Sequence, residues 1–317
     1  MNKKNLVCGV DIGGTNTTAG LVSPEGKIIL KKNIPTTSHA SVEEYISDLS
    51  AIIKEMVCEA ECNLTGIGIG APNGNFYNGT IEFAANLPWK GIIDFVKLMK
   101  QHFPTQEIIL TNDANAAAWG EKIYGAAKDE SDFIMITLGT GVGSGIIADG
   151  KIIYGHDGFA GEIGHTILYP NGRECGCGKK GCLETYTSAS GIVKTAIELL
   201  NEKNTNSLLN NISKEKITSK VIANAALQGD AVALEIFDKT AYYLAWKIAD
   251  AVALTSPSSV YIFGGVAKAG DLLMVPMKKY FNDFLLQIHK NKVQLKWSAL
   301  PDNDAAILGA ASLIQKN

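Results

Sequence analysis

The residues best suited to chemistry gather in the short segment 162–184. It contains His165 and a C-x-C-x4-C run formed by Cys175, Cys177 and Cys182. One imidazole and three thiols are the Cys3His set of a closed structural zinc site, which leaves no coordination position for a reactive water. We therefore expect a zinc ion that holds this loop in shape at the centre of an active site. Because the spacing is unusual, small packed cysteines beside an unrelated histidine remain an alternative.

Asp113 is the second candidate, because it follows a buried strand at 108–110 and precedes a helix rich in small residues. In α/β folds catalytic groups project from this edge of a sheet, where a carboxylate can accept a hydroxyl proton as a general base. An aspartate here can also cap the helix. The two roles are compatible, and the sequence alone leaves both open.

Glycine and threonine turns follow apolar strands at 13–18 and again at 138–145. Their bare amides and hydroxyls can approach a phosphate closely, although an ordinary hairpin turn is the alternative for the first. No G-x-x-x-x-G-K-[ST] sequence occurs, which excludes a P-loop. A third strand at 259–263 runs into Gly264 and Gly265, a junction that could lie against a nucleobase or ribose.

Composition limits the class of protein. The chain has 317 residues, with 46% hydrophobic and 19% charged, which suggests two globular domains. A net charge of -3 does not favour nucleic acid or an anionic membrane as partners. The apolar run near the start is too short for a signal peptide or a membrane span. Six cysteines, half of them in one cluster, fit a reducing compartment, so we expect a cytoplasmic enzyme.

The elements that must position these residues form a mixed α/β pattern. A buried strand over 6–12 opens a series of antiparallel hairpins, and an amphipathic helix over 41–60 begins with a capping box. Long helices are expected over 231–254 and 271–288. The final helix, from about Asp304, is rich in small residues and suits a close crossing between domains.

Taken together, these motifs resemble the ROK kinases and repressors, over essentially the whole chain. Residues 11–15 are similar to the first phosphate motif of that family, 138–145 to the second and 262–267 to its adenosine motif. The most specific matches are E-x-G-H at 162–165 and the cysteine segment 175–184, which resemble the family signature and its zinc site.

The resemblance implies an α/β fold of two actin-like (ribonuclease H-like) domains, with mixed sheets flanked by helices and a structural zinc loop at 165–182. The small N-terminal domain would comprise 1–113, with a C-terminal helix at 303–317 packing back onto it. The larger domain would comprise 114–302.

The resemblance also implies roles, position by position. Asp113 would be the catalytic base that takes the proton from the sugar 6-hydroxyl, and Asp11 would help to place Mg²⁺ through water. The implied sugar-binding residues are Asn86, Asn112, Asp113, Glu162, His165 and Glu184. The implied ATP-binding residues are Asp11, Gly13, Gly14, Thr15, Thr140, Gly141, Gly264 and Gly265. The implied zinc ligands are His165, Cys175, Cys177 and Cys182.

The expected function is an ATP-dependent kinase for the 6-hydroxyl of glucose, using ATP, Mg²⁺ and a structural Zn²⁺ and forming a homodimer. Kinases for N-acetylglucosamine, N-acetylmannosamine or fructose remain alternatives, because the loops at 71–74 and 86–89 depart from the usual family pattern. A sugar-responsive repressor is disfavoured, since the ten residues before Asp11 are too few for a helix-turn-helix module. A sugar sensor without catalysis is the remaining alternative, against which the intact motifs argue.

Overall fold

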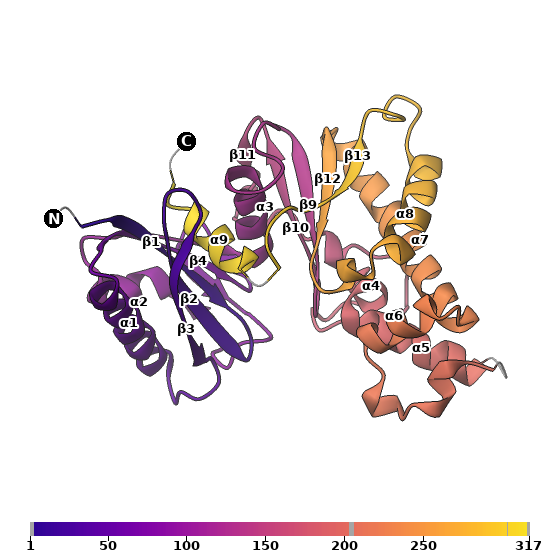
Figure 1. The fold of residues 1–317 in the computed structure, drawn as a ribbon, viewed down its shortest axis with the longest axis horizontal. Coiled ribbons are helices and arrows are strands. Elements are labelled where there is room, and N and C mark those ends of the chain that lie inside the picture. The colour runs from indigo at the N-terminus through magenta and orange to yellow at the C-terminus, as the bar shows by residue number, and fades with distance from the viewer. Residues whose placement is uncertain (1–2, 203–205, 303, 316–317) are drawn as a thin grey trace. The chain divides into compact units, whose positions relative to one another are not determined.

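The computed structural model describes residues 3–202, 206–302 and 304–315. The chain divides into two compact units. Unit 1 comprises residues 1–131, 145–161 and 298–317, and unit 2 comprises 132–144 and 162–297. Mixed sheets flanked by helices confirm the expected α/β class (Figure 1). The domains expected from the sequence, 1–113 with helix 303–317 and 114–302, stay a proposal, and residues 303, 316 and 317 of that helix lie outside the described residues.

Unit 1 is built on a five-stranded sheet in the order β3-β2-β1-β4-β8. Strands β1, β2 and β3 pair antiparallel, as the hairpin pattern predicts, whereas β4 runs parallel to both β1 and β8. Its elements are β1 (Asn5–Ile12), β2 (Asn16–Val22), β3 (Ile28–Pro35), α1 (Val42–Glu59), β4 (Asn63–Ala71), β5 (Gly74–Asn75), β6 (Thr80–Glu82), β7 (Ile92–Ile93), α2 (Phe95–His102), β8 (Glu107–Asn112), α3 (Asp113–Ile123), β11 (Lys151–Ile152) and α9 (Ala305–Ser312).

Helices cover both faces of this sheet. The Ser41 side chain caps α1 by accepting the Glu44 backbone N–H at 3.2 Å, and the apolar side of α1 packs on one face with Leu6, Val10 and the other buried side chains of the main core. On the opposite face α9 packs against β1 and β4. Because both faces are covered, β1 is almost continuously buried.

Unit 2 contains strands that pair in parallel, with β12 between β9 and β13. They belong to a second sheet in the order β11-β10-β9-β12-β13. The elements with residues in unit 2 are β9 (Phe133–Leu138), β10 (Val142–Ala148), η1 (Ile163–His165), α4 (Glu184–Thr187), α5 (Ala189–Glu202), η2 (Leu208–Asn211), η3 (Lys214–Lys216), α6 (Ser219–Leu227), α7 (Ala231–Thr255), β12 (Ser259–Phe263), η4 (Val266–Ala269), α8 (Asp271–Phe284) and β13 (Gln294–Trp297), and residues 145–148 of β10 belong to unit 1.

One helix end differs from the sequence prediction. The helix expected over 271–288 ends at Phe284, because Leu285 has extended backbone angles (φ -64°, ψ 139°) that turn the chain away. Leu285 is buried, so leaving the helix here places its side chain in the core. The helix expected over 231–254 is confirmed, since α7 ends at Thr255 and Ser256 is left-handed (φ 48°).

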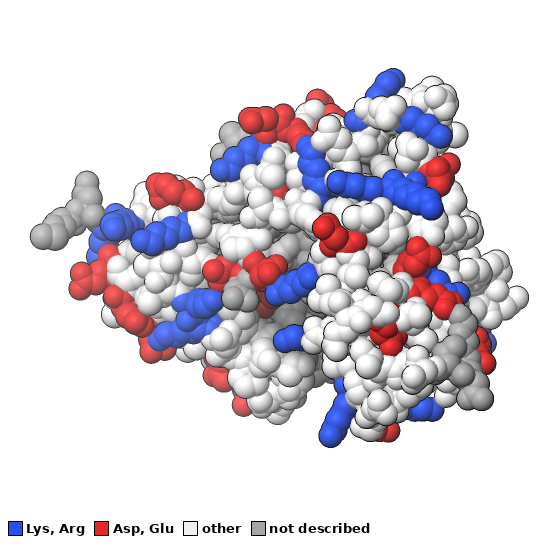
Figure 2. All heavy atoms as spheres, turned by 45° about the vertical axis from the view of Figure 1, so that its right-hand side comes forward, with Lys and Arg blue, Asp and Glu red and all other residues white. Residues whose placement is uncertain are grey.

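Neither sign of charge dominates the face of the molecule drawn in Figure 2. On the face drawn in Figure 2, the described acidic and basic side chains are intermixed. This agrees with the net charge of -3. Among the described residues, none of the helices has the length and apolar character needed to cross a membrane.

Candidate active site

Two aspartates lie at the same edge of the unit 1 sheet. Asp11 is near the end of β1, and Asp113 directly follows β8. Strand β4 lies between these strands and runs parallel to both, so their carboxyl ends meet at one edge. At this edge the negative charge of Asp113 acts on the Asp11 carboxyl.

Both carboxyl groups have perturbed acidities. Burial, followed by the negative charge of Asp113, raises the pKa of Asp11 to about 6. Surrounding protein atoms also desolvate the Asp113 carboxyl and raise its pKa, although part of the side chain is accessible to solvent. The backbone N–H of Ala114 opposes this shift by donating to Asp113 Oδ1 at 2.8 Å. A pKa shifted upward suits a carboxylate that must accept a proton.

The helix cap is Asn112 rather than Asp113. The Asn112 side-chain oxygen accepts the Ala114 N–H at 2.8 Å, and Asp113 is the first residue of α3. Reading Asp113 as a simple N-cap is therefore wrong. Beyond its contacts with the backbone N–H groups of Ala114 and of Asp113 itself, the Asp113 carboxylate keeps acceptor sites that can receive a substrate hydroxyl.

The first glycine turn lies close to the loop that carries Asn86. A Cβ on Gly14 would stand 2.8 Å from the Asn86 carbonyl oxygen, so this approach requires glycine. Asn86 and Thr15 are both exposed, and the Gly13 N–H donates to the Asn16 carbonyl at 3.0 Å. The structure thus brings a predicted sugar-binding residue beside the first predicted phosphate turn.

Sequence reasoning missed the polar side chains that hold this turn. The Thr36 hydroxyl donates to the Gly13 carbonyl at 2.8 Å, and the Thr36 N–H donates to the Thr15 carbonyl at 2.8 Å. Behind Thr36, the Thr17 hydroxyl lies 3.0 Å from Thr36 Oγ1 and 2.6 Å from the Tyr45 hydroxyl. These side chains are completely buried. In the sequence Thr17 stands between Asn16 and Thr18, and Thr36 is followed by Thr37, so no apolar pattern marked these residues.

In unit 2 the Cys/His cluster forms as predicted. The ligand atoms of His165, Cys175, Cys177 and Cys182 all lie within 4.8 Å of one another. Cys177 Sγ is 3.6 Å from Cys182 Sγ, and Cys175 Sγ is 3.6 Å from His165 Nδ1. Bond lengths of about 2.3 Å to sulfur and 2.0 Å to nitrogen give tetrahedron edges of roughly 3.5–3.8 Å. These residues therefore fit a tetrahedral zinc ion.

His165 uses its two ring nitrogens differently. Its Nδ1 faces the thiols, whereas its Nε2 lies 3.9 Å from Glu162 Oε2. A ligand on Nδ1 fixes the ring so that Nε2 carries the proton and can donate. The geometry thus allows the ring to bind a metal on one side and a hydroxyl group on the other.

Glu184 begins α4 and contacts two other parts of the predicted site. Its Oε2 accepts the Val142 backbone N–H at 2.9 Å, and its Oε1 lies 3.8 Å from Cys175 Sγ. Val142 belongs to the second predicted phosphate turn, next to Gly141 and the exposed Thr140. A residue predicted only to bind sugar therefore also contacts the phosphate turn and the Cys/His cluster.

Arg173 is a second feature that sequence reasoning missed. Its guanidinium pairs with the Glu198 carboxylate, donates to the carbonyls of Thr185 (2.6 Å) and Gly191 (3.1 Å), and lies 4.3 Å from the Tyr186 ring centroid. It thereby ties the cysteine loop to α4 and α5. A lone arginine between loop residues gave no sign of this role in the sequence.

The glycine pair after β12 lies beside a cavity. Gly264 has a left-handed backbone (φ 108°), and a Cβ there would stand 2.4 Å from the Leu138 carbonyl oxygen. Gly265 lines a cavity of about 360 Å³ together with residues of α6, Phe237 of α7 and residues of η4. Asn224 and Lys220 on α6 add polar groups to this lining, and the sequence did not single them out. A mixed apolar and polar wall of this size suits a nucleoside.

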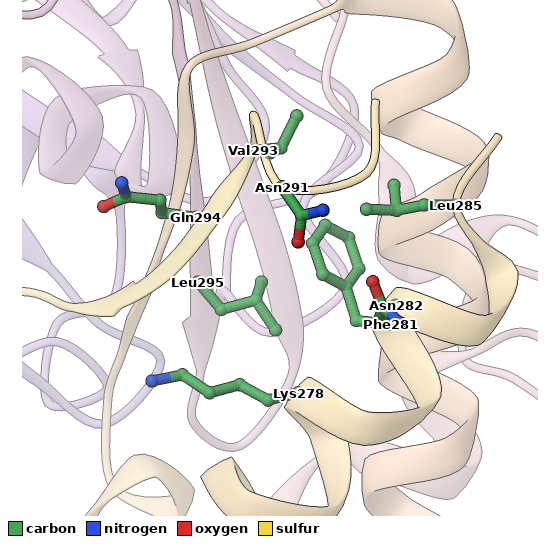
Figure 3. A pocket seen from close by; sticks show the side chains of 8 residues that line it. All are labelled: Lys278, Phe281, Asn282, Leu285, Asn291, Val293, Gln294 and Leu295. Carbon is green, nitrogen blue, oxygen red and sulfur yellow. The ribbon is translucent and has the colours of Figure 1, made fainter. Parts of the chain in front are cut away.

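A second cavity in unit 2, of about 300 Å³, contains none of the predicted site residues. Figure 3 shows its lining, which comes from α8, the segment after it and β13. Lys278 is its one ionisable side chain, and the remainder are apolar or amide groups. Without a carboxylate it lacks a base for proton transfer, so we do not assign it to the reaction.

The structure places the predicted residues in two groups, each described within its own unit. Unit 1 carries Asp11, Gly13, Gly14, Thr15, Asn86, Asn112 and Asp113. Unit 2 carries Thr140, Gly141, Glu162, His165, Cys175, Cys177, Cys182, Glu184, Gly264 and Gly265.

Comparison with known proteins gives a consistent picture. A family model described as the ROK family matches residues 7–317. A glucokinase from Halalkalibacterium halodurans is 36% identical, covering 97% of this chain and 94% of the relative. A glucokinase from Thermotoga maritima is also 36% identical, covering 100% of this chain and 99% of the relative. A ROK family glucokinase from Streptomyces griseus, crystallised with glucose and AMPPNP, is 35% identical with a TM-score of 0.81, covering 97% of this chain and 98% of that one.

Proposed function

Since this chain belongs to the ROK family, we propose that it is a kinase that transfers the γ-phosphoryl group of ATP to the 6-hydroxyl of glucose. The observation that carries the proposal is Asp113, a carboxylate of raised pKa at a strand-to-helix junction with acceptor sites to spare. The similarity of the whole chain to proteins named glucokinase supports the reaction and the sugar.

In this mechanism Asp113 accepts the proton of the 6-hydroxyl while the hydroxyl oxygen attacks the γ-phosphorus. The bond between the γ-phosphorus and the β,γ-bridging oxygen breaks, and ADP leaves with that oxygen. Phosphoryl transfer needs little covalent help from a protein, so positioning and charge stabilisation supply most of the rate. The turns at 13–15 and 140–141 offer backbone amides and threonine hydroxyls to the phosphates. The cavity beside Gly265 would receive the nucleoside.

Two metal ions belong to the proposal. Mg²⁺ would be held near Asp11 through water, and it would neutralise charge on the phosphates. His165, Cys175, Cys177 and Cys182 would hold a structural Zn²⁺, whose geometry they fit. The zinc would fix the His165 ring so that Nε2 can bind a sugar hydroxyl.

Glu162, His165 and Glu184 would bind the sugar hydroxyls from unit 2, and Asn86 and Asn112 from unit 1. Carboxylates and amides form paired hydrogen bonds with neighbouring hydroxyls. We further propose that the protein is a cytoplasmic homodimer. In support of this compartment, Cys8, Cys58 and Cys62 are free thiols and the other three cysteines form the proposed zinc site, which suits a reducing environment.

The decisive experiment measures ADP release from ATP and Mg²⁺ with glucose, mannose, fructose, N-acetylglucosamine and N-acetylmannosamine, using wild type and Asp113→Asn. We expect glucose to drive the fastest turnover, and the variant to lose it while still binding glucose. If another sugar is phosphorylated faster, the reaction stands and its substrate changes. If none is phosphorylated although glucose binds, the kinase proposal is wrong and a sugar sensor replaces it.

A further inference from the structure

The carboxylate of Glu184 is hydrogen-bonded inside the second phosphate turn. Its Oε2 takes the Val142 backbone N–H at 2.9 Å, one of the few donors that this turn can offer to an anion. The approach is close enough that a Cβ on Gly141 would stand 2.4 Å from the same oxygen. Glu184 therefore places a negative charge where nucleotide phosphates are expected to bind.

The backbone around Glu184 is joined to the same turn. The Ala189 N–H donates to the Gly139 carbonyl at 2.9 Å, and the Ser188 N–H donates to the Glu184 carbonyl at 3.1 Å. Glu184 at the start of α4 and Ala189 at the start of α5 are thus both bonded to residues 139–142. A change in the hydrogen bonds of the Glu184 carboxylate therefore acts on the turn through one direct contact. No longer chain of coupled residues is needed.

We propose that Glu184 couples sugar binding to nucleotide binding, an inference that rests on the proposed function. When sugar hydroxyls donate to the carboxylate, they disperse its negative charge and fix its orientation. Dispersing the charge favours phosphates at the turn by weakening repulsion, and fixing the carboxylate on Val142 holds the backbone of the turn in one conformation. Sugar and ATP consequently bind with positive cooperativity, and each raises the affinity for the other by the same factor.

The test is the coupling factor, the ratio of the dissociation constants of a non-hydrolysable ATP analogue without and with saturating glucose. We expect at least about fivefold tightening in the wild type, within the usual range for coupled sites. Gly141→Ala pushes the carboxylate off Val142 without changing either group, and its backbone does not need a left-handed conformation. In this variant the coupling factor should fall towards one.

Gly139→Ala is the matched control, because it makes the same change in the same turn but its Cβ meets no atom within 4 Å. It should keep the wild-type coupling factor. Equal coupling in the two alanine variants, or a wild-type factor near one, would overturn the inference. If the wild type phosphorylates glucose under either of these outcomes, the kinase function still stands and only the role of Glu184 fails.

A second variant tests the charge and does not depend on whether Gly141→Ala folds. Glu184→Gln keeps an oxygen that can accept the Val142 N–H, but it removes the negative charge. Affinity for the ATP analogue without glucose should rise severalfold, whereas zinc content and the thermal midpoint stay near wild type. Unchanged or weaker binding of the analogue would show that the charge does not oppose the phosphates.

Discussion

The two units hold their predicted site residues by different means. In unit 1, Asp11 and Asp113 stand at the ends of parallel strands, and backbone pairing through β4 sets their separation. In unit 2, Glu162, His165 and Glu184 lie in or beside an irregular loop whose shape depends on side chains. We infer that the sheet of unit 1 holds the predicted catalytic carboxylates in fixed positions. The predicted binding groups of unit 2 instead depend on the side chains that shape the loop around them.

The largest effect should separate chemistry from binding. Asp113→Asn should lower kcat by about 10²–10⁴-fold with little change in the KM for glucose, because the amide cannot accept the proton. Glu162→Gln in unit 2 should mainly raise KM. Steady-state kinetics with ATP held saturating measure both variants. Similar losses of kcat in the two variants would show that the predicted residues of units 1 and 2 do not separate into catalytic and binding groups.

A second prediction concerns the desolvated carboxylate of Asp11. Its pKa is about 6 in the folded protein against an ordinary value of 3.8, so the folded state prefers the protonated form. This stabilising contribution is full below about pH 3.8 and is lost as the pH rises through about 6. At about 1.4 kcal/mol for each pKa unit, this shift changes the free energy of unfolding by roughly 3 kcal/mol at most.

Asp11→Asn should therefore raise the urea midpoint of the metal-free protein at pH 8, and much less at pH 4.5. The effect comes from burial, so the exposed Asp94 of the same unit supplies the control. Asp94→Asn should change the midpoint little at either pH. If Asp11→Asn shifts the urea midpoint equally at pH 8 and at pH 4.5, the charge of the Asp11 carboxylate is not the cause of the shift.

The units also differ in how far the sequence predicts them. The local hydrophobic pattern predicts where a buried strand ends, and therefore which polar residue follows it. Asp113, predicted to follow the strand at 108–110, directly follows β8. The Cys/His cluster was predictable because its ligands lie close together in the chain. The contacts of Arg173 and of Thr36 were not, since they join residues that only tertiary structure brings together. The end of α8 at Phe284 was missed for the same reason, because burial of Leu285 decides it.

Loss of the proposed zinc should affect unit 2 alone. Cys175→Ser removes one thiolate and leaves His165, Cys177 and Cys182 as the remaining ligands. Zinc measured by elemental analysis should fall well below one ion per chain, and glucose affinity should weaken by about 10–100-fold as the His165 ring loses its orientation. Cys58→Ser is the control, because this exposed cysteine lies outside the cluster. Full zinc occupancy in Cys175→Ser would refute the metal site.

The smallest effect should come from Arg173, which supports the same loop without metal. Arg173→Lys keeps the charge but cannot reproduce the forked contacts to Glu198 and to two carbonyls. We therefore expect the free energy of unfolding to fall by about 1–2 kcal/mol and the KM for glucose to rise severalfold. Zinc content should stay at the wild-type level, since Arg173 is not a ligand. Lys180→Ala, which breaks an exposed 3.3 Å pair with Glu174 in the same loop, should cost less than about 1 kcal/mol. If Arg173→Lys and Lys180→Ala cause equal losses of stability, the contacts of Arg173 do not hold the cysteine loop. The metal and the backbone turns of the loop would then fix its shape, as backbone pairing does in unit 1.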